Sequence, residues 1–207
     1  MNKKSILKTV LVSVFVLLNV SINAQDFNSK LAAFSSSYEK EYTQNYDDAI
    51  KPLENIYSKD DYEINLRLGW LYYLKGDHNK SVAFYKKAVV LKPSSVEAKL
   101  ALVNPLSYLG NWDEIVTTYE ELLKTDAKNY TVNYRLSLIW YNRKKYSQAL
   151  SYAKAIQPVY PFDYETNLLL GKINIALGNI IDAKSALQKA ILYNPLATEP
   201  IEILKGL

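Results

Sequence analysis

Residues 62–95 read YEINLRLGWLYYLKGDHNKSVAFYKKAVVLKPSS, and this stretch decides the fold. Its first half spaces apolar residues such as Ile64 and Leu68 as a helix does, without the alternation of a strand. Gly76 follows, and glycine tolerates the left-handed conformation that closes a helix. The next residue is an aspartate, which suits a helix start. Pro93 cannot continue a helix and ends the second half. The stretch therefore predicts two helices joined by a tight turn.

The same pattern returns every 34 residues along the chain. Leucine recurs at one position, and proline recurs at another in three of four copies. A fixed period of this size indicates a stack of similar supersecondary units that complete each other's cores. The leucine column is Leu68, Leu102, Leu136 and Leu170, the proline column is Pro93, Ala127, Pro161 and Pro195, and the units span 62–95, 96–129, 130–163 and 164–197. A degenerate unit over 30–61 precedes them.

These columns resemble the tetratricopeptide repeat, a helix–turn–helix of 34 residues. The chain departs from the family in one column, where the usual tryptophan is replaced by Asn65, Lys99, Asn133 and Asn167. The resemblance implies an all-α fold, a right-handed α-solenoid of antiparallel helix pairs forming a single domain over residues 25–207. Residues 198–207 are too short for another unit, and we expect a short capping helix there, beginning near Pro200.

The first 24 residues are expected to lie outside the fold. Lysines at the start precede a mostly apolar run over 10–20, and Ala24 offers a small residue for cleavage. This layout is typical of a secretory signal peptide of bacterial appearance. We therefore expect cleavage after Ala24 and an exported protein, periplasmic or secreted, with no membrane span in the mature chain. An uncleaved anchor is the alternative.

The composition disfavours nucleic acid as a partner. The chain has 25 Lys and Arg against 21 Asp and Glu, but three of the lysines lie in the leader, which leaves 22 basic residues against 21. A nucleic-acid binder would carry a marked basic surface. The chain contains no cysteine, so disulfides and thiolate metal sites are absent.

No set of residues in the sequence predicts catalysis, a cofactor or a metal site. The one histidine, His78, falls in a predicted turn and has only Asp77 nearby as a candidate partner. Paired acids such as Glu120-Glu121 serve catalysis only when they converge on a pocket. We therefore expect a protein that is not an enzyme.

The resemblance implies that the first helices line a concave groove and point fixed positions into it. The candidate groove residues are Leu66, Trp70, Tyr73, Leu100, Asn104, Tyr134, Leu138 and Tyr141. Trp and Tyr are favoured at interface hot spots, but Trp70 and Tyr73 could equally pack in the core. Pro105 would either bend the helix near Asn104 or mark a helix end.

The sequence thus favours an exported adaptor that binds a protein or peptide segment in the groove. Two alternatives remain: a glycan or small-ligand binder that uses the aromatic residues, or a scaffold subunit of a cell-envelope complex. No sequence feature specifies the partner or the oligomeric state.

Overall fold

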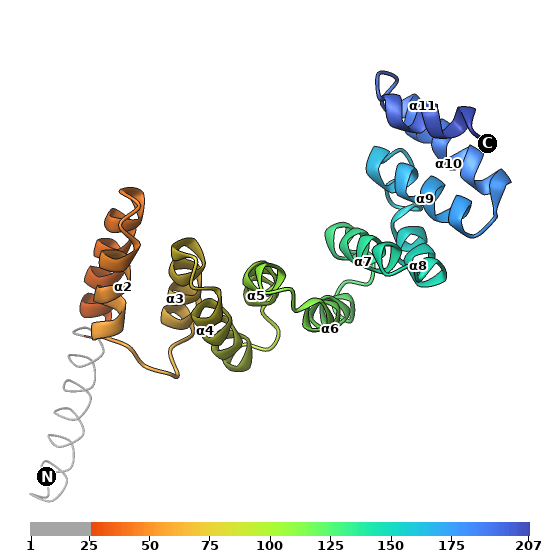
Figure 1. Cartoon of the computed structure of the whole chain (residues 1–207). Coiled ribbons are helices and arrows are strands. Elements are labelled where there is room, and N and C mark those ends of the chain that lie inside the picture. The colour runs from red at the N-terminus through yellow and green to blue at the C-terminus, as the bar shows by residue number, and fades with distance from the viewer. Residues whose placement is uncertain (1–25) are drawn as a thin grey trace, which may run out of the picture. The chain divides into compact units, whose positions relative to one another are not determined.

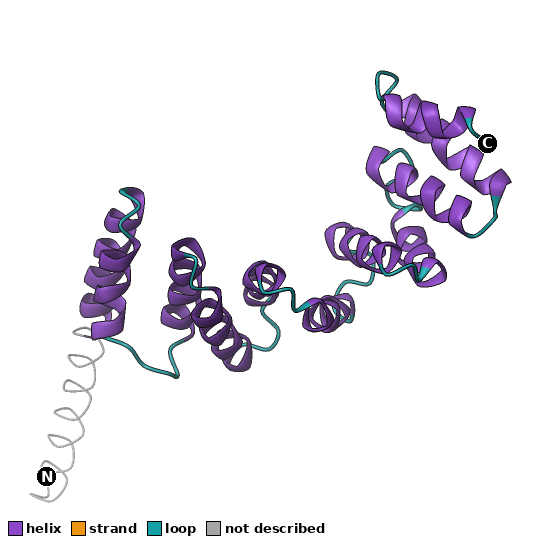
Figure 2. Ribbon diagram, viewed as in Figure 1, coloured by secondary structure: helices purple, strands orange, loops and turns teal. Residues whose placement is uncertain are grey.

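The computed structural model describes residues 26–207, and throughout this range the regular secondary structure is helical (Figures 1 and 2). The all-α prediction is therefore confirmed, whereas the predicted signal peptide lies outside the described residues. No helix in the described range is long and apolar enough to cross a membrane. The helices are a first one over 26–42, then α2 (Tyr46–Asn55), α3 (Tyr62–Lys75), α4 (His78–Leu91), α5 (Val96–Tyr108), α6 (Trp112–Leu123), α7 (Tyr130–Asn142), α8 (Tyr146–Ile156), α9 (Tyr164–Ala176), α10 (Ile180–Tyr193) and α11 (Thr198–Lys205).

The helices form two compact units, one ending at Leu109 and one spanning Gly110–Leu207. The described part of the first, or N-terminal, unit contains the helix over 26–42 and α2 to α5. The second, or C-terminal, unit contains α6 to α11. Neighbouring helices within a unit pack through their apolar faces, and the expectation of a single domain over 25–207 stays a prediction.

Each unit has its own apolar core. In the N-terminal unit, Leu53, Leu68 and Leu71 are fully buried between the helix over 26–42, α2 and α3. In the C-terminal unit, Ile173 lies with the small residues of α8, and a further cluster around Leu187 is covered by the apolar side chains of α11. Burial of a leucine or isoleucine contributes about 1.5–3 kcal/mol, so each leucine of the column stabilises the unit in which it is buried.

Small residues let paired helices approach closely, and a hydroxyl joins them. A Cβ atom at Gly69 would lie 2.6 Å from the ring of Tyr85, so only glycine fits there without a shift. The Ser81 hydroxyl on α4 donates to the Gly69 carbonyl on α3 at 2.7 Å. Two repeats later the link is reversed, because Ser137 on α7 donates to the Ala149 carbonyl on α8 at 2.9 Å.

The asparagines that replace the family's tryptophan have a structural role. The amide of Asn133 donates to the carbonyls of Asn129 at 2.9 Å and of Ala127 at 3.0 Å, which ties the start of α7 to the preceding loop. Asn65 and Asn167 make the equivalent pair of bonds at the starts of α3 and α9. Buried polar groups need such partners. In each pair one carbonyl also accepts a helical backbone N–H, and the asparagine amide adds a bond to the loop carbonyl before it.

Pro105 lies inside α5 and not at its end, because the helix continues to Tyr108. The side chain is buried, and the Leu109 N–H donates to the Pro105 carbonyl at 3.1 Å. Proline has no N–H of its own, so residue 105 cannot donate to the carbonyl of Ala101 one turn earlier. The interpretation of Pro105 as a helix end is therefore wrong.

Candidate functional site

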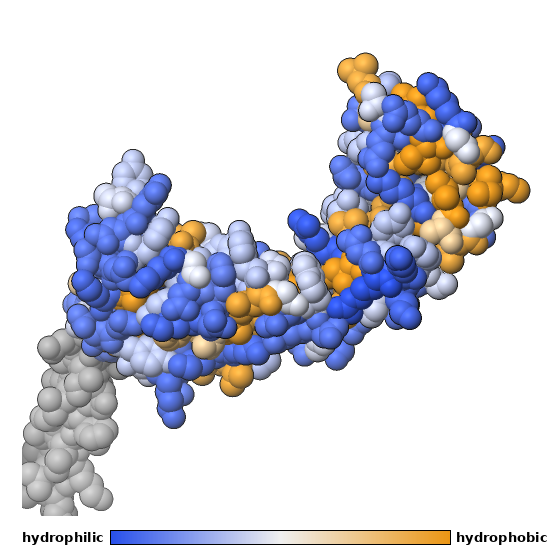
Figure 3. All heavy atoms as spheres, viewed as in Figure 1, coloured by the Kyte–Doolittle hydropathy of each residue, from blue (hydrophilic) through white to orange (hydrophobic). Residues whose placement is uncertain are grey.

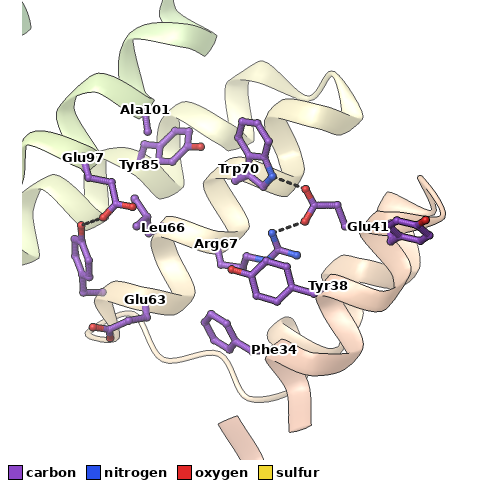
Figure 4. Close-up of a pocket in the computed structure, with 12 residues that line it drawn as sticks. Phe34, Tyr38, Glu41, Glu63, Leu66, Arg67, Trp70, Tyr85, Glu97 and Ala101 are labelled. Carbon is purple, nitrogen blue, oxygen red and sulfur yellow. Dashed lines mark hydrogen bonds and ion pairs between the residues drawn. The ribbon is translucent and has the colours of Figure 1, made fainter. Parts of the chain in front are cut away.

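The N-terminal unit contains a hollow of about 940 Å³ between the helix over 26–42, α3 and α5, with one side chain of α4 at its floor (Figure 4). Six of the twelve side chains that line it are aromatic, and three are carboxylates. The lining residues are Phe34, Tyr38, Glu41, Tyr42, Tyr62, Glu63, Leu66, Arg67, Trp70, Tyr85, Glu97 and Ala101.

A buried ion pair forms one wall of the hollow. Arg67 is 6 % exposed, and its guanidinium contacts the Glu41 carboxylate at 2.5 Å and donates to the Ser37 hydroxyl at 3.2 Å. The Trp70 indole N–H donates to the other Glu41 oxygen at 2.6 Å. The guanidinium also lies over the ring of Tyr38, 3.7 Å from its centroid. These contacts fix the orientation of both rings and join the first helix to α3.

Glu63 stands at another edge, between two lysines. Its carboxylate accepts from Lys92 at 3.1 Å and from Lys30 at 3.3 Å. Partial burial alone would raise the pKa of Glu63, but the hydrogen bonds from Lys92, from the backbone and from Lys30 outweigh it and lower the pKa to about 2. Glu63 is therefore ionised at neutral pH and cannot serve as a proton donor there.

Glu97, at the start of α5, has a different environment. Its carboxylate accepts a long hydrogen bond of 3.5 Å from the Tyr62 hydroxyl, which is also bonded to the Ser95 hydroxyl at 2.8 Å. Below it lies Tyr85, which is 2 % exposed. Burial raises the pKa of Tyr85, and the charges of Tyr73 and Glu97 add to this effect. Tyr85 is thus a neutral floor beneath a charged rim.

Two of the predicted groove residues, Leu66 and Trp70, line the hollow, and Trp70 also packs against the core of the unit. Tyr73 lies beside it, with its ring 5.8 Å from those of Trp70 and Tyr108. Leu100 is half-buried and Asn104 is exposed on α5, and neither lines the hollow. The structure therefore gathers part of the predicted set in the N-terminal unit.

The three predicted residues of α7 belong to the C-terminal unit. Tyr134, Leu138 and Tyr141 are half-buried and pack against the cluster that contains Ile173. The Tyr134 hydroxyl donates to Glu165 at 3.2 Å, and Tyr141 contacts the ring of Tyr146 at 5.6 Å. Burial, together with the charge of Glu165, raises the pKa of Tyr134 to about 12. These side chains thus contribute to the packing of their own unit, and their role in binding stays a prediction.

Sequence reasoning missed the first helix as a wall of the hollow. Phe34, Tyr38, Glu41 and Tyr42 come from it, and Arg67 was not among the predicted positions. The apolar spacing along that helix, from Phe27 through Leu31 and Phe34 to Tyr38, carries the helical signal that could have found it.

Neither His78 nor the acids form a metal site. In the described part of the chain, no group of three His, Asp or Glu side chains is placed to hold an ion. The His78 ring stacks on Tyr108 at 4.4 Å. This histidine therefore has a packing role at the start of α4.

The C-terminal unit presents a different surface, with apolar side chains exposed over α9 to α11 (Figure 3). Ile181 is 87 % exposed, Leu192 is 73 % exposed and Leu196 is 91 % exposed. The two surfaces therefore differ in chemistry: this one is apolar, whereas the hollow of the N-terminal unit combines aromatic rings with charged side chains.

Two solved structures illustrate which known proteins share this fold. The crystal structure of MamA superposes with a TM-score of 0.70 at 18 % identity, covering 81 % of this chain and 92 % of MamA. A tetratricopeptide repeat protein from Parabacteroides merdae gives a TM-score of 0.72 at 15 % identity, covering 86 % of this chain and 71 % of that one. At these identities the likeness shows the fold alone.

Among curated proteins, the chain is similar to BBSome complex member BBS4. It is 22 % identical to the Bos taurus protein over 189 residues, covering 74 % of this chain and 36 % of the relative. It is 24 % identical to the Mus musculus protein over 164 residues, covering 63 % of this chain and 32 % of the relative. The chain thus spans about a third of the length of these relatives.

Family models described as Tetratricopeptide repeat match residues 62–95, 100–164 and 164–195, which together make up more than half of the sequence. The matched ranges contain α3, α4 and α6 to α10, and most of α5. The sequence resemblance is thereby confirmed, and the chain belongs to the tetratricopeptide repeat family.

Proposed function

We propose that this protein is an adaptor that binds an extended segment of a partner protein in the hollow of its N-terminal unit. Its tetratricopeptide repeats make the chain a protein–protein interaction module. The observation that carries the finer proposal is the aromatic lining of a hollow of about 940 Å³, contributed by Phe34, Tyr38, Tyr42 and Trp70 among others. Trp and Tyr dominate interface hot spots because they bury much area at small entropic loss.

Two aromatic rings that line the hollow are held in fixed orientations, which supports a role in binding. Trp70 is held by its bond to Glu41, and Tyr38 is held under the Arg67 guanidinium. Rings that are already ordered lose little freedom when a ligand packs on them, which favours affinity. Tyr42 lines the hollow and is 92 % exposed, so its ring offers apolar surface to a bound segment.

Two of the three carboxylates of the hollow favour binding over acid–base catalysis. Glu41 is held by Arg67 and Trp70, and the pKa of Glu63 is lowered to about 2. A general acid or base needs a pKa near the working pH. We therefore propose a role without catalysis.

Export is a further part of this proposal. The lysines, the apolar run and Ala24 in the first 24 residues support a cleaved leader and a periplasmic or secreted protein. Fractionation of producing cells, with mass spectrometry of the intact chain, tests it. A mature N-terminus at Gln25 in the exported fraction is expected, and a full-length chain retained with the cytoplasmic fraction would contradict export.

The binding role is tested by selection from a random library of displayed 12-residue peptides on the purified chain. We expect enriched sequences, and we expect Tyr42→Ala to weaken their binding because it removes an exposed ring from the rim. Tyr193→Ala is the matched control, since Tyr193 is an exposed tyrosine of the C-terminal unit (61 %). Equal loss of binding in both variants, or no enriched peptide at all, would refute the proposal.

The alternatives predict different outcomes. A glycan binder would retain sugars on a glycan array and lose them with Tyr42→Ala, while the peptide selection would fail. A scaffold subunit would self-associate, and light scattering of the purified chain would show species larger than 23.7 kDa.

A further inference from the structure

The three carboxylates of the hollow differ in how they are neutralised. Both oxygens of Glu41 are engaged, one by Arg67 at 2.5 Å and the other by the Trp70 indole at 2.6 Å. Both oxygens of Glu63 are engaged by lysines. Glu97 contacts only the Tyr62 hydroxyl at 3.5 Å, and within residues 26–207 no Lys or Arg forms an ion pair with it. One carboxylate of the hollow therefore lacks a cation.

The cation of the hollow is not available to an anionic ligand. Arg67 is already paired with Glu41 and stacked on Tyr38, and its remaining nitrogen, Nη2, is buried out of a ligand's reach, although it has no hydrogen-bond partner among the described residues. An acidic ligand would therefore meet Glu97 without reaching a free positive charge. Like charges brought together at an interface disfavour binding, so the lining disfavours an acidic segment.

The surroundings of Glu97 fit a long basic side chain. Ala101 lies one turn further along the same face of α5, and Leu66 lies across from it on α3 (Figure 4). Both offer apolar surface on which the stem of a lysine or arginine packs. Lysine and arginine carry several donors and no acceptor, which matches a carboxylate that accepts one long hydrogen bond from Tyr62.

The aromatic ring nearest to Glu97 already holds a cation. The Lys92 ammonium lies 3.9 Å from the centroid of the Tyr62 ring, and the Tyr62 hydroxyl points at Glu97. Ring faces attract cations through their quadrupole. A lysine held against a tyrosine ring thus already occurs beside Glu97 within this unit.

From these contacts we infer that the segment bound in the hollow inserts a lysine or arginine side chain, with its stem between Leu66 and Ala101 and its charged head at Glu97. This inference rests on the proposed function, because it specifies the chemistry of the segment that the hollow binds. The partner is thus a protein with an exposed, extended stretch that carries a basic residue among apolar ones.

The probes are the peptides selected from the displayed 12-residue library, synthesised with a fluorophore and measured by anisotropy. We expect lysine or arginine at one fixed position of the selected set. Replacing that residue with glutamine, or replacing Glu97 with Gln in the protein, should weaken binding about tenfold, the factor that a single charge-assisted hydrogen bond of about 1.5 kcal/mol supplies. The two replacements together should weaken it little more than either alone, because they remove the same contact.

Glu39→Gln is the matched control. It removes the same charge from the same unit, but the Glu39 side chain is 73 % exposed and does not line the hollow. We expect its affinity to stay within about twofold of the wild type, with equal circular dichroism for both variants.

The outcomes separate the inference from the proposed function. The inference of an inserted basic side chain would be refuted by selected peptides that lack a fixed basic residue or are rich in acids. It would also be refuted by equal effects of Glu97→Gln and Glu39→Gln. Each of these results would leave the adaptor role intact. Failure to select any peptide would refute the adaptor role itself, and the inference with it.

Discussion

Gly69 shows how one residue serves both the fold and the hollow. The ring of Tyr85 on α4 lies directly against it, so that an added Cβ would come within 2.6 Å of the ring. The same ring forms the floor of the hollow beneath Glu97. A side chain at position 69 would therefore push the floor upward as well as separate α3 from α4.

We expect Gly69→Ala to destabilise the N-terminal unit by about 1–3 kcal/mol, the usual cost of overpacking, and to weaken peptide binding. Urea denaturation followed by circular dichroism measures the first effect, and anisotropy measures the second.

Gly171→Ala is the control, because a Cβ atom added at Gly171 would lie 2.7 Å from the Leu187 side chain of the C-terminal unit, and Gly171 does not line the hollow. It should destabilise similarly and leave binding unchanged. Binding that survives Gly69→Ala at full strength would show that Tyr85 is not part of the site.

Lys144 is the exception in the column of turn glycines. Gly76, Gly110 and Gly178 have φ between 71° and 86°, and Lys144 has φ of 58° at the same place in its repeat. A left-handed conformation costs a residue with a Cβ about 1–2 kcal/mol, whereas glycine costs about 0.5–1 kcal/mol through the entropy of the unfolded chain.

Lys144→Gly should therefore stabilise the protein by about 0.5–1 kcal/mol, the difference between these two terms. Thermal melting measures it, with Lys145→Gly as the control because Lys145 is not at positive φ. A lower melting temperature for Lys144→Gly would contradict the argument.

The burial of a residue was predictable from sequence where the repeat period sets it. It was unpredictable where contacts with a distant helix set it. The leucine column is buried as the period implies. Arg67, in contrast, looks like a surface residue in sequence, and its burial depends on Glu41 and Ser37 of a helix that lies outside the regular period. No local pattern identifies a charge that is neutralised from about 26 residues away.

At the scale of the helix, the asparagine column acts as a tie between a helix start and the loop before it. The Asn133 side chain is 1 % exposed and donates both bonds from one amide nitrogen. Loss of a buried donor leaves two carbonyls without that partner.

We expect Asn133→Ala to destabilise the C-terminal unit by about 1–3 kcal/mol, as measured by urea denaturation. Asn142→Ala, at the exposed end of the same helix, should change stability by less than about 0.5 kcal/mol. Equal effects of the two substitutions would show that the tie contributes nothing.

The helix over 26–42 shows which elements the period does not predict. The connection after α2 covers residues 56–61, whereas the one after α4 covers 92–95. This difference in length puts residues 26–55 out of register with the period of 34. The columns that align the later repeats therefore do not show which residues of the first helix correspond to groove positions. Its aromatic stripe was visible in sequence, but only packing against α3 shows that it faces a hollow.

At the scale of the whole chain, the last helix closes the apolar core of the C-terminal unit. Ile203 and Leu204 of α11, with Leu207, pack on the cluster of Leu168, Leu187 and Ala190. A capping element was predicted for residues 198–207, and α11 (Thr198–Lys205) is found there.

Truncation after Ala197 should lower the stability of the C-terminal unit by about 2–4 kcal/mol, since three partly buried apolar side chains are lost. It should also increase binding of an environment-sensitive dye to the exposed cluster. Lys205→Ala, an exposed change in the same helix, is the control. An unchanged melting curve for the truncated chain would show that α11 does not stabilise the apolar cluster on which it packs.

The division into two units was not visible in the sequence. It falls at Leu109 and Gly110, where the turn has the same glycine, with φ of 71°, as the turns inside each unit. A period reports that repeats exist, but the sequence at this turn does not distinguish a boundary from an ordinary helix connection.

The reversed hydroxyl link between paired helices limits how these repeats can be recombined. A hybrid of α3 with α8 would bring Gly69 opposite Ala149 and contain no hydroxyl at the crossing, while a hybrid of α7 with α4 would place Ser137 and Ser81 there together. Neither hybrid restores the arrangement of one donor facing one carbonyl. Engineered chimaeras of this chain should therefore exchange whole repeats, so that each hydroxyl keeps the carbonyl it faces.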